Sequence, residues 1–152
     1  MRAQAQLLTF TDLVGVVQER WQSYWADAVT YAGQQWQPVQ FEVPGVVDGD
    51  PGSDRGISIL MPASSRVVRV VEGALAAGWV AQLQMFEFDA AAGAAAPPAS
   101  MTLLSQFDGQ AVRAKASVTS ISLELGTALA PVGATVPPRI LSTRLMGVGA
   151  RL

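Results

Sequence analysis

The sequence contains no cysteine and no histidine. Without cysteine the chain can form no disulfide, no thiolate metal site and no thiol nucleophile, so its stability must come from packing. Without histidine it lacks the commonest general base, the commonest metal ligand and the side chain that changes charge near neutral pH. These absences exclude the usual hydrolytic triads, and we expect a protein that is not an enzyme.

The sequence is also poor in charge and in long apolar runs. Charged residues make up 14% of its 152 residues and hydrophobic residues 50%, with a net charge of −2. Such a chain is too apolar to be disordered, and its length suits one domain, residues 1–152. The scarcity of charge indicates that partners cover part of the surface. The acidic balance argues against specific nucleic-acid binding.

No apolar run reaches the roughly 18 residues that a membrane-spanning helix needs. The N-terminus, MRAQAQLLTF, lacks the apolar core and cleavage site of a signal peptide. We therefore expect no membrane association and assembly in a cytoplasm.

Charge is unevenly distributed along the chain. Beyond residue 110 the net charge is about +4, and before it about −6. The charged residues beyond 110 are five basic ones and one acidic one: Arg113, Lys115, Arg139, Arg144, Arg151 and Glu124. This asymmetry suits head-to-tail docking of like subunits, and it is equally typical of a solvated sheet face.

The first half of the chain predicts one helix or irregular segment and one hairpin. Thr11 and Asp12 can cap a helix, and apolar residues near helical spacing predict a short helix or an irregular entry segment over 12–24. From Ala28 the apolar residues alternate, which predicts a β-hairpin over 28–43 with its turn at 33–35. Pro44 and Gly45 end it, and VDGDPGSDRG after them predicts a loop.

The middle of the chain predicts a strand, a helix and a second strand. An apolar run predicts a strand over 56–61. Ser64 or Ser65 then caps a helix with one apolar face, which ends at Gly78. Alternation over 79–88 predicts the next strand.

The last third predicts further strands joined by loops. Residues 89–100 are low in complexity and rich in Ala and Pro, which predicts an exposed, mobile loop. A strand over 101–107 is followed by Asp108-Gly109, a strong hairpin signal. One long strand is predicted over 111–125, with a β-bulge near Thr119 or Ser120 where the apolar parity shifts. A loop over 126–138 and a last strand over 139–147 complete the chain.

This order of elements favours one fold class. Runs of strands with an inserted helix predict an α+β domain, mainly antiparallel β, with a barrel-like or split-barrel sheet and one or two short helices.

Carboxylate clusters are the only residues that indicate a site for chemistry. Asp48, Asp50 and Asp54 lie close together in the sequence, and Glu87 and Asp89 lie near a strand end. The first group has the oxygen-rich composition of a calcium loop but lacks the later bidentate Glu of an EF-hand, so a solvated turn is the favoured interpretation. Whether it binds an ion stays open. We assign no catalytic, cofactor-binding or metal residues, and no cofactor.

The four tryptophans could stack on sugars or bases. They are Trp21, Trp25, Trp36 and Trp79. Their neighbours follow apolar patterns, which favours burial in a core or an interface over a ligand platform.

Three segments together carry a family resemblance. They are an aromatic hairpin, VTYAGQQWQPVQFEV (29–43); a strand and short helix, GISILMPASSRVVRVVEGALAAG (56–78); and a closing sheet, FDGQAVRAKASVTSISLEL (107–125) with PPRILSTRLMG (137–147). This arrangement resembles the bacteriophage minor tail proteins of the tail tip, a family of uncharacterised function similar to distal tail and baseplate hub adaptor proteins. Some members hold an iron–sulfur cluster through cysteines, which this chain lacks.

The resemblance implies a structural role in a virion. It implies a β-barrel or split-barrel sheet with one flanking helix, and a ring-forming homo-oligomer at the tail tip or baseplate that joins the tail tube to distal tail proteins. Sheet edges would pair with neighbouring subunits, and the loops at 45–56, 89–100 and 126–138 would contact other tail proteins. Deleting 90–98 would then spare the fold and impair assembly. The alternative is a small β-module that binds carbohydrate or another ligand.

Overall fold

A computed structural model describes residues 1–43 and 56–127. In these residues the chain forms eight strands and one helix. The elements are β1 (Arg2–Thr11), β2 (Val17–Gln22), β3 (Val29–Tyr31), β4 (Gln34–Pro38), β5 (Ile57–Pro62), α1 (Ser65–Ala77), β6 (Val80–Asp89), β7 (Thr102–Ala116) and β8 (Ser120–Thr127). The helix is not long and apolar enough to cross a membrane.

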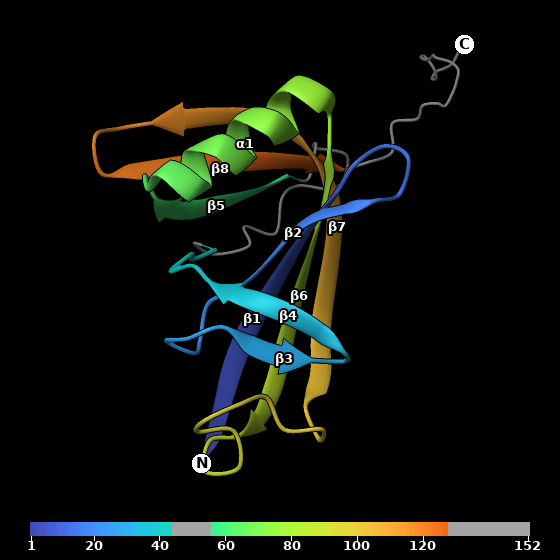
Figure 1. Cartoon of the computed structure of the whole chain (residues 1–152), viewed down its shortest axis with the longest axis vertical. Helices are drawn as coiled ribbons and strands as arrows, with labels where there is room; N and C mark the ends of the chain where they lie inside the picture. The colour runs from blue at the N-terminus through green and yellow to red at the C-terminus, as the bar shows by residue number, and fades with distance from the viewer. Residues whose placement is uncertain (44–55, 128–152) are drawn as a thin grey trace.

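The strands form a single mixed sheet in the order β3-β4-β2-β1-β6-β7-β8-β5. Every pairing is antiparallel except that of β2 with β4, which is parallel. The predicted fold class is therefore confirmed, with one helix in the described residues and with a sheet that does not close into a barrel. Figure 1 shows β1, β6 and β7 as a long central ribbon, with α1, β5 and β8 at one end and β3 and β4 at the other.

The long ribbon buries opposite faces at its two ends. Side chains alternate between the faces of a strand, so two consecutive buried residues must face opposite ways. Leu7 and Leu8 in β1 are both buried, and they belong to different hydrophobic cores. The sheet is therefore covered on one face near α1 and on the other face near β3 and β4.

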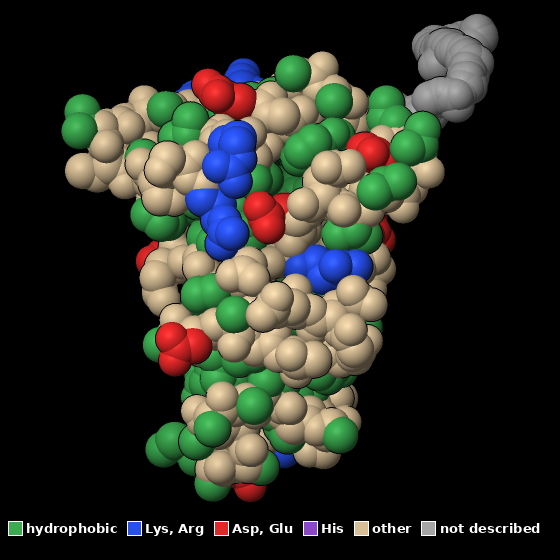
Figure 2. Space-filling model, viewed as in Figure 1, with side chains coloured by type: hydrophobic (Ala, Val, Ile, Leu, Met, Phe, Trp, Pro, Cys, Tyr) green, Lys and Arg blue, Asp and Glu red, His purple; other side chains and the backbone are tan. Residues whose placement is uncertain are grey.

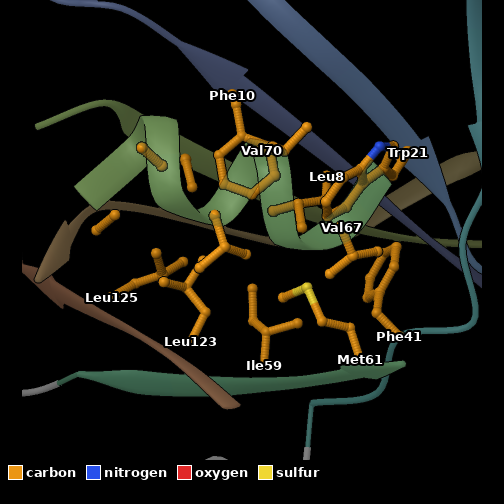
Figure 3. Close-up of a cluster of buried hydrophobic side chains, with 14 of the residues drawn as sticks. Leu8, Phe10, Trp21, Phe41, Ile59, Met61, Val67, Val70, Leu123 and Leu125 are labelled. Carbon is orange, nitrogen blue, oxygen red and sulfur yellow. The ribbon is translucent and has the colours of Figure 1, made fainter. Parts of the chain in front are cut away.

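The larger core lies between the sheet and α1. Figure 3 shows Val67 and Val70 of the helix projecting towards Ile59, Met61 and Leu123 of β5 and β8. Phe10 and Trp21 close the core from β1 and β2, with their rings edge-to-face and their centroids 5.1 Å apart. Burial of this apolar surface is the main favourable free energy of the domain.

The smaller core is aromatic and lies under β3 and β4. Its buried members are Ala5, Leu7, Trp25, Val29, Trp36, Phe86, Phe88 and Met101. Trp25 and Phe88 stack with ring centroids 5.5 Å apart. β3 and β4 meet in the two-residue turn Ala32-Gly33, where both residues have positive φ, as a type I′ hairpin requires.

The sequence of α1 explains why it is a helix despite its valines. The Ser64 hydroxyl accepts a hydrogen bond from the Val67 N–H, which satisfies one free donor of the first turn. Gly78 ends the helix in the left-handed conformation, and its N–H bonds to the Ala74 carbonyl. Both predicted helix ends are thus confirmed, as are the strands on either side.

One buried carboxamide shapes the corner that leaves β2. The Gln22 side chain is fully buried, and its Nε2 donates to the carbonyls of Trp25 and Asp27 at 2.8 and 3.1 Å. Its Oε1 accepts from the N–H groups of Tyr24 and Trp25 at 2.9 and 2.7 Å. The side chain therefore pairs with backbone groups of residues 24–27, as a neighbouring strand would elsewhere in the sheet. These bonds hold the corner in the conformation that places Trp25 in the smaller core.

The prediction of a short helix or an irregular entry segment over 12–24 is wrong. Residues 2–11 and 17–22 form a hairpin of two strands instead. Apolar residues at helical spacing in this segment do not share a face. Trp21 points into the larger core, whereas Leu13 is exposed at the turn.

The predicted hairpin turn at Asp108-Gly109 is also wrong. β7 runs through both residues, and Gly109 pairs with Ala81 on one side and Thr127 on the other. A Cβ at Gly109 would lie 2.6 Å from the Gly126 carbonyl oxygen, so the glycine serves close packing rather than a turn. The turn comes at Ser117–Ser120, which explains the shift in apolar parity without a bulge there.

The predicted hairpin over 28–43 is right in kind but too long. Its second strand ends at Pro38, and Val39 and Phe41 are buried beyond the strand. The predicted loop over 126–138 starts too early, because β8 runs to Thr127, and the rest of that loop lies outside the described residues. The predicted loop at 45–56, apart from Gly56, and the last strand over 139–147 also lie outside them.

The Ala- and Pro-rich segment is a loop, as predicted, but it is not wholly exposed. Gly93 at its centre is buried, and its carbonyl accepts a hydrogen bond of 2.8 Å from the Trp25 indole N–H. A Cβ on Gly93 would overlap the Phe88 ring. Deletion of 90–98 would therefore remove contacts of the smaller core, and it is not the neutral change that the sequence indicated.

We expect Gln22→Ala to lower the free energy of unfolding by about 3 kcal/mol or more, because it leaves buried N–H and C=O groups unpaired. Gln35→Ala is the matched control, since Gln35 is exposed on β4. The control should change stability by less than about 0.5 kcal/mol. Urea unfolding of the two variants measures the difference, and equal effects would contradict the role given to Gln22.

We expect Gly93→Ala to cost about 1–3 kcal/mol, because the added methyl group overpacks the loop against Phe88. Ala95→Ser, at an exposed position of the same loop, should be nearly neutral. Thermal unfolding followed by tryptophan fluorescence compares the two. A neutral Gly93→Ala would show that the loop does not pack against the smaller core in solution.

Candidate functional site

The carboxylates that the sequence singled out do not form a site in the described part of the chain. Glu87 makes an ion pair with Arg2 at 3.1 Å. Asp89 accepts a hydrogen bond of 3.0 Å from the Ala91 N–H and thereby starts the loop that follows. Asp48, Asp50 and Asp54 lie outside the described residues. Within residues 1–43 and 56–127 no group of three or more acidic residues could hold a metal ion.

The tryptophans are structural, as their apolar neighbours predicted. Trp21, Trp25 and Trp36 are buried in the two cores. Trp79 is half-buried and packs against α1, where a Cβ at Gly73 would touch its ring at 3.0 Å. Trp21, Trp25 and Trp36 therefore present no open face for stacking on a sugar or a base.

The turn between β1 and β2 is an exposed apolar tip. Its side chains Leu13, Val14 and Val16 are 69%, 84% and 55% exposed. We call residues 12–16 the hairpin tip. In Figures 1 and 2, which share one view, hydrophobic side chains gather at the upper right, where this hairpin projects from the body. Three large apolar side chains that are exposed to solvent next to one another are typical of a contact with another protein.

Asp12 makes the hairpin tip rigid. Its Oδ1 accepts from the N–H groups of Val14 and Val16 at 3.0 and 2.9 Å, and its Oδ2 accepts from Gln18 Nε2 at 2.8 Å. The Val16 hydrogen bond is the largest cause that lowers the pKa of the Asp12 carboxyl, and partial desolvation opposes it. A tip that is ordered before it binds loses less conformational entropy on binding.

A polar face lies next to the hairpin tip. Gln82 and Gln106 both donate to the Asp108 carboxylate, at 3.1 Å each, and Gln84 donates to Gln106 at 3.1 Å. A shallow hollow of about 470 Å³ lies between these hydrogen-bonded side chains and the tip. It is lined by Thr9, Thr11, Asp12, Leu13, Gly15, Val17, Val80, Gln82 and Asp108. The hydrogen-bonded side chains of this face are polar, and Asp108 carries the one charge among them.

The third uncovered feature is the lower half of β7. β8 pairs with β7 only from Gly109 onward, so Thr102–Asp108 has a strand on one side only in the part of the chain that the structure describes. Leu103 and Leu104 are 45% and 46% exposed there. We call residues 102–108 the free edge.

These features together suit binding to protein surfaces. The hairpin tip offers apolar side chains, the polar face offers amide groups, and the free edge offers main-chain donors and acceptors. Sequence reasoning missed the tip because it assigned the apolar residues after Asp12 to a short helix or an irregular entry segment. The sequence signal for a turn was Gly15, because glycine tolerates positive φ. In the structure Gly15 has a φ of +92°.

Comparisons with known proteins find similarity to solved structures and no matching sequence family. No protein-family model and no curated protein matches the chain. The fold is similar to that of a chain in a structure titled "Virion of native gene transfer agent (GTA) particle", with a TM-score of 0.55 and 16% sequence identity over 91% of this chain. At that identity the likeness shows the fold alone. The match takes in 44% of the other chain, so this protein spans less than half of its length.

Proposed function

We propose that this chain is a structural, non-enzymatic subunit of a phage-like virion. The observation that carries the proposal is the fold shared with a chain of the gene transfer agent virion, at a TM-score of 0.55. Its sequence resemblance to tail-tip proteins supports the same class. The uncovered surfaces agree with it, because a subunit that works by binding its neighbours needs such surfaces.

Within that class we propose a place at the tail tip or baseplate hub. There the chain would form a ring with copies of itself and join the tail tube to distal tail components, after assembly in the host cytoplasm. A ring needs a heterologous contact, in which two different surfaces of one subunit meet on neighbours. The hairpin tip projects from one side of the sheet and can supply one of these surfaces (Figure 1).

The alternative of a carbohydrate-binding module has less support. Such modules stack exposed aromatic rings on sugars. Here Trp21, Trp25 and Trp36 are buried in the cores. Tyr24, at 40% exposure, packs edge-to-face against Phe88.

We expect the purified chain to form a closed oligomer, such as a trimer or hexamer, alone or with the tail proteins encoded beside it. Light scattering gives the mass, and negative-stain electron microscopy shows whether the particle is a ring. A monomer that joins no complex with those tail proteins would contradict the proposal.

We expect the double variant Leu13→Ser, Val14→Ser to lose oligomer or complex formation, with an apparent Kd at least about tenfold weaker. Its melting temperature should stay close to that of the parent chain, because both side chains are exposed. Val118→Ser is the matched control, since Val118 is 97% exposed at the β7–β8 turn. Unchanged assembly of the tip variant would exclude the tip from the contact.

We expect the order of the hairpin tip to be lost only in strong acid. The pKa of Asp12 is lowered from its ordinary value of 3.8 in the folded protein, so its carboxylate stabilises the turn above that pH. The stabilisation disappears as the pH falls through the lowered pKa. The amide shifts of Val14 and Val16 should titrate by NMR with a midpoint below 3.8, and Asp12→Ala should abolish this titration. A midpoint at or above 3.8 would contradict the geometry.

A further inference from the structure

The free edge of β7 has the properties of a site for an added strand. In the lower half of the molecule β7 is the outermost strand of the ribbon, as Figure 1 shows. The Ala111 N–H donates to the Trp79 carbonyl at 3.1 Å, which fixes the hydrogen-bonding pattern towards β6. Because this pattern alternates in antiparallel pairs, the main-chain groups of Gln106 and Asp108 point away from β6.

Most of the free edge lacks the devices by which proteins protect exposed edges. Such devices are charged side chains, prolines, β-bulges and covering segments. Residues 102–107, TLLSQF, contain no charge and no proline. Asp108 is the one charge of the free edge, and a register shift against β6 leaves one extra residue, Leu104, in β7. Leu103 and Leu104 are about half exposed beside the main-chain groups. An edge of this kind is adhesive unless another strand covers it.

The position at which β8 ends identifies a segment of the same chain as the occupant. Thr127 pairs with Gly109, directly beside the upper end of the free edge. Residues 128–152 follow it, and within them RILSTRLMG (139–147) is the strand that the sequence predicts. The connecting residues 128–138 can reach roughly 35 Å, whereas the free edge is only about 20 Å long.

Charge also favours this occupant. The segment from 128 to the C-terminus contains Arg139, Arg144 and Arg151 and no acidic residue. The free edge ends at Asp108, and Asp89 lies at the lower end of the neighbouring strand. Attachment to the same chain further gives the segment a high effective concentration at the edge.

We propose that residues 139–147 add to the free edge of β7 as an antiparallel strand of the same molecule. The added strand covers Leu103 and Leu104, and it pairs with the main-chain groups of Gln106 and Asp108. This inference concerns the isolated subunit and does not depend on the virion role.

Amide exchange measured by NMR on the full chain tests the proposal. The amides of Gln106 and Asp108 should exchange at least about tenfold more slowly than open-edge amides. The amide of Phe107, which faces β6, is protected in any case and reports that the sheet is intact. Fast exchange at Gln106 and Asp108 in the full chain would overturn the proposal.

Two proline variants show which segment gives the protection. Thr143→Pro removes a strand donor in the middle of the segment, and it should release Gln106 and Asp108 while Phe107 stays protected. Ala150→Pro, outside the segment, should leave all three amides unchanged. Protection that survives Thr143→Pro would overturn the assignment to this segment. Protection that rises with protein concentration would overturn the assignment to the same chain and point to a second copy.

A disulfide scan gives an independent readout that needs no proline. The chain has no cysteine, so Gln106→Cys can be combined in turn with a cysteine at each of residues 140–145. At least one pair should form a disulfide within one chain under mild oxidation, as mass spectrometry of the intact monomer shows. Disulfides only between chains, or none at any position, would overturn the proposal.

Discussion

The change of buried face between Leu7 and Leu8 is the constraint on which the rest of the structure depends. A strand has two faces, so a ribbon that buries both must find a separate cover for each. Near α1 the cover is the helix with β5 and β8, and near the N-terminus it is β3, β4 and Trp25. Within residues 1–43 and 56–127, each half of the ribbon therefore keeps one face without a cover, and these two faces lie on opposite sides of the sheet.

Gln22 provides hydrogen-bond partners for the backbone at the corner after β2. Between Trp21 in the larger core and Trp25 in the smaller core, the chain turns away from the sheet, so its backbone groups there have no neighbouring strand to pair with. A buried polar side chain is costly unless every group is paired. The two donated and two accepted bonds of Gln22 meet that condition. By contrast, the Trp21 indole N–H is buried with no acceptor in the described residues.

Much of the fold could be predicted from the sequence, and the errors have physical causes. α1 was predictable because its capping residues and its apolar face agree. The β1–β2 hairpin was not predictable, because residues 12–24 have apolar side chains near helical spacing. Only packing against the two cores determines on which face of the sheet each of these side chains lies. Asp108-Gly109 is a strong local turn signal, yet Gly109 has strand partners on both sides. Tertiary pairing outweighs the local preference there.

The candidate surfaces were less predictable than the fold because no motif encodes them. The charge asymmetry illustrates this. Arg113 is one of the C-terminal cations, but it pairs with Glu124 at 2.8 Å, and this hydrogen bond lowers the pKa of that carboxyl. Of the described cations beyond residue 110, Lys115 has no such ion pair. The basic excess therefore lies mainly in residues 139–152, and a head-to-tail contact between unlike charges would depend on where that segment sits.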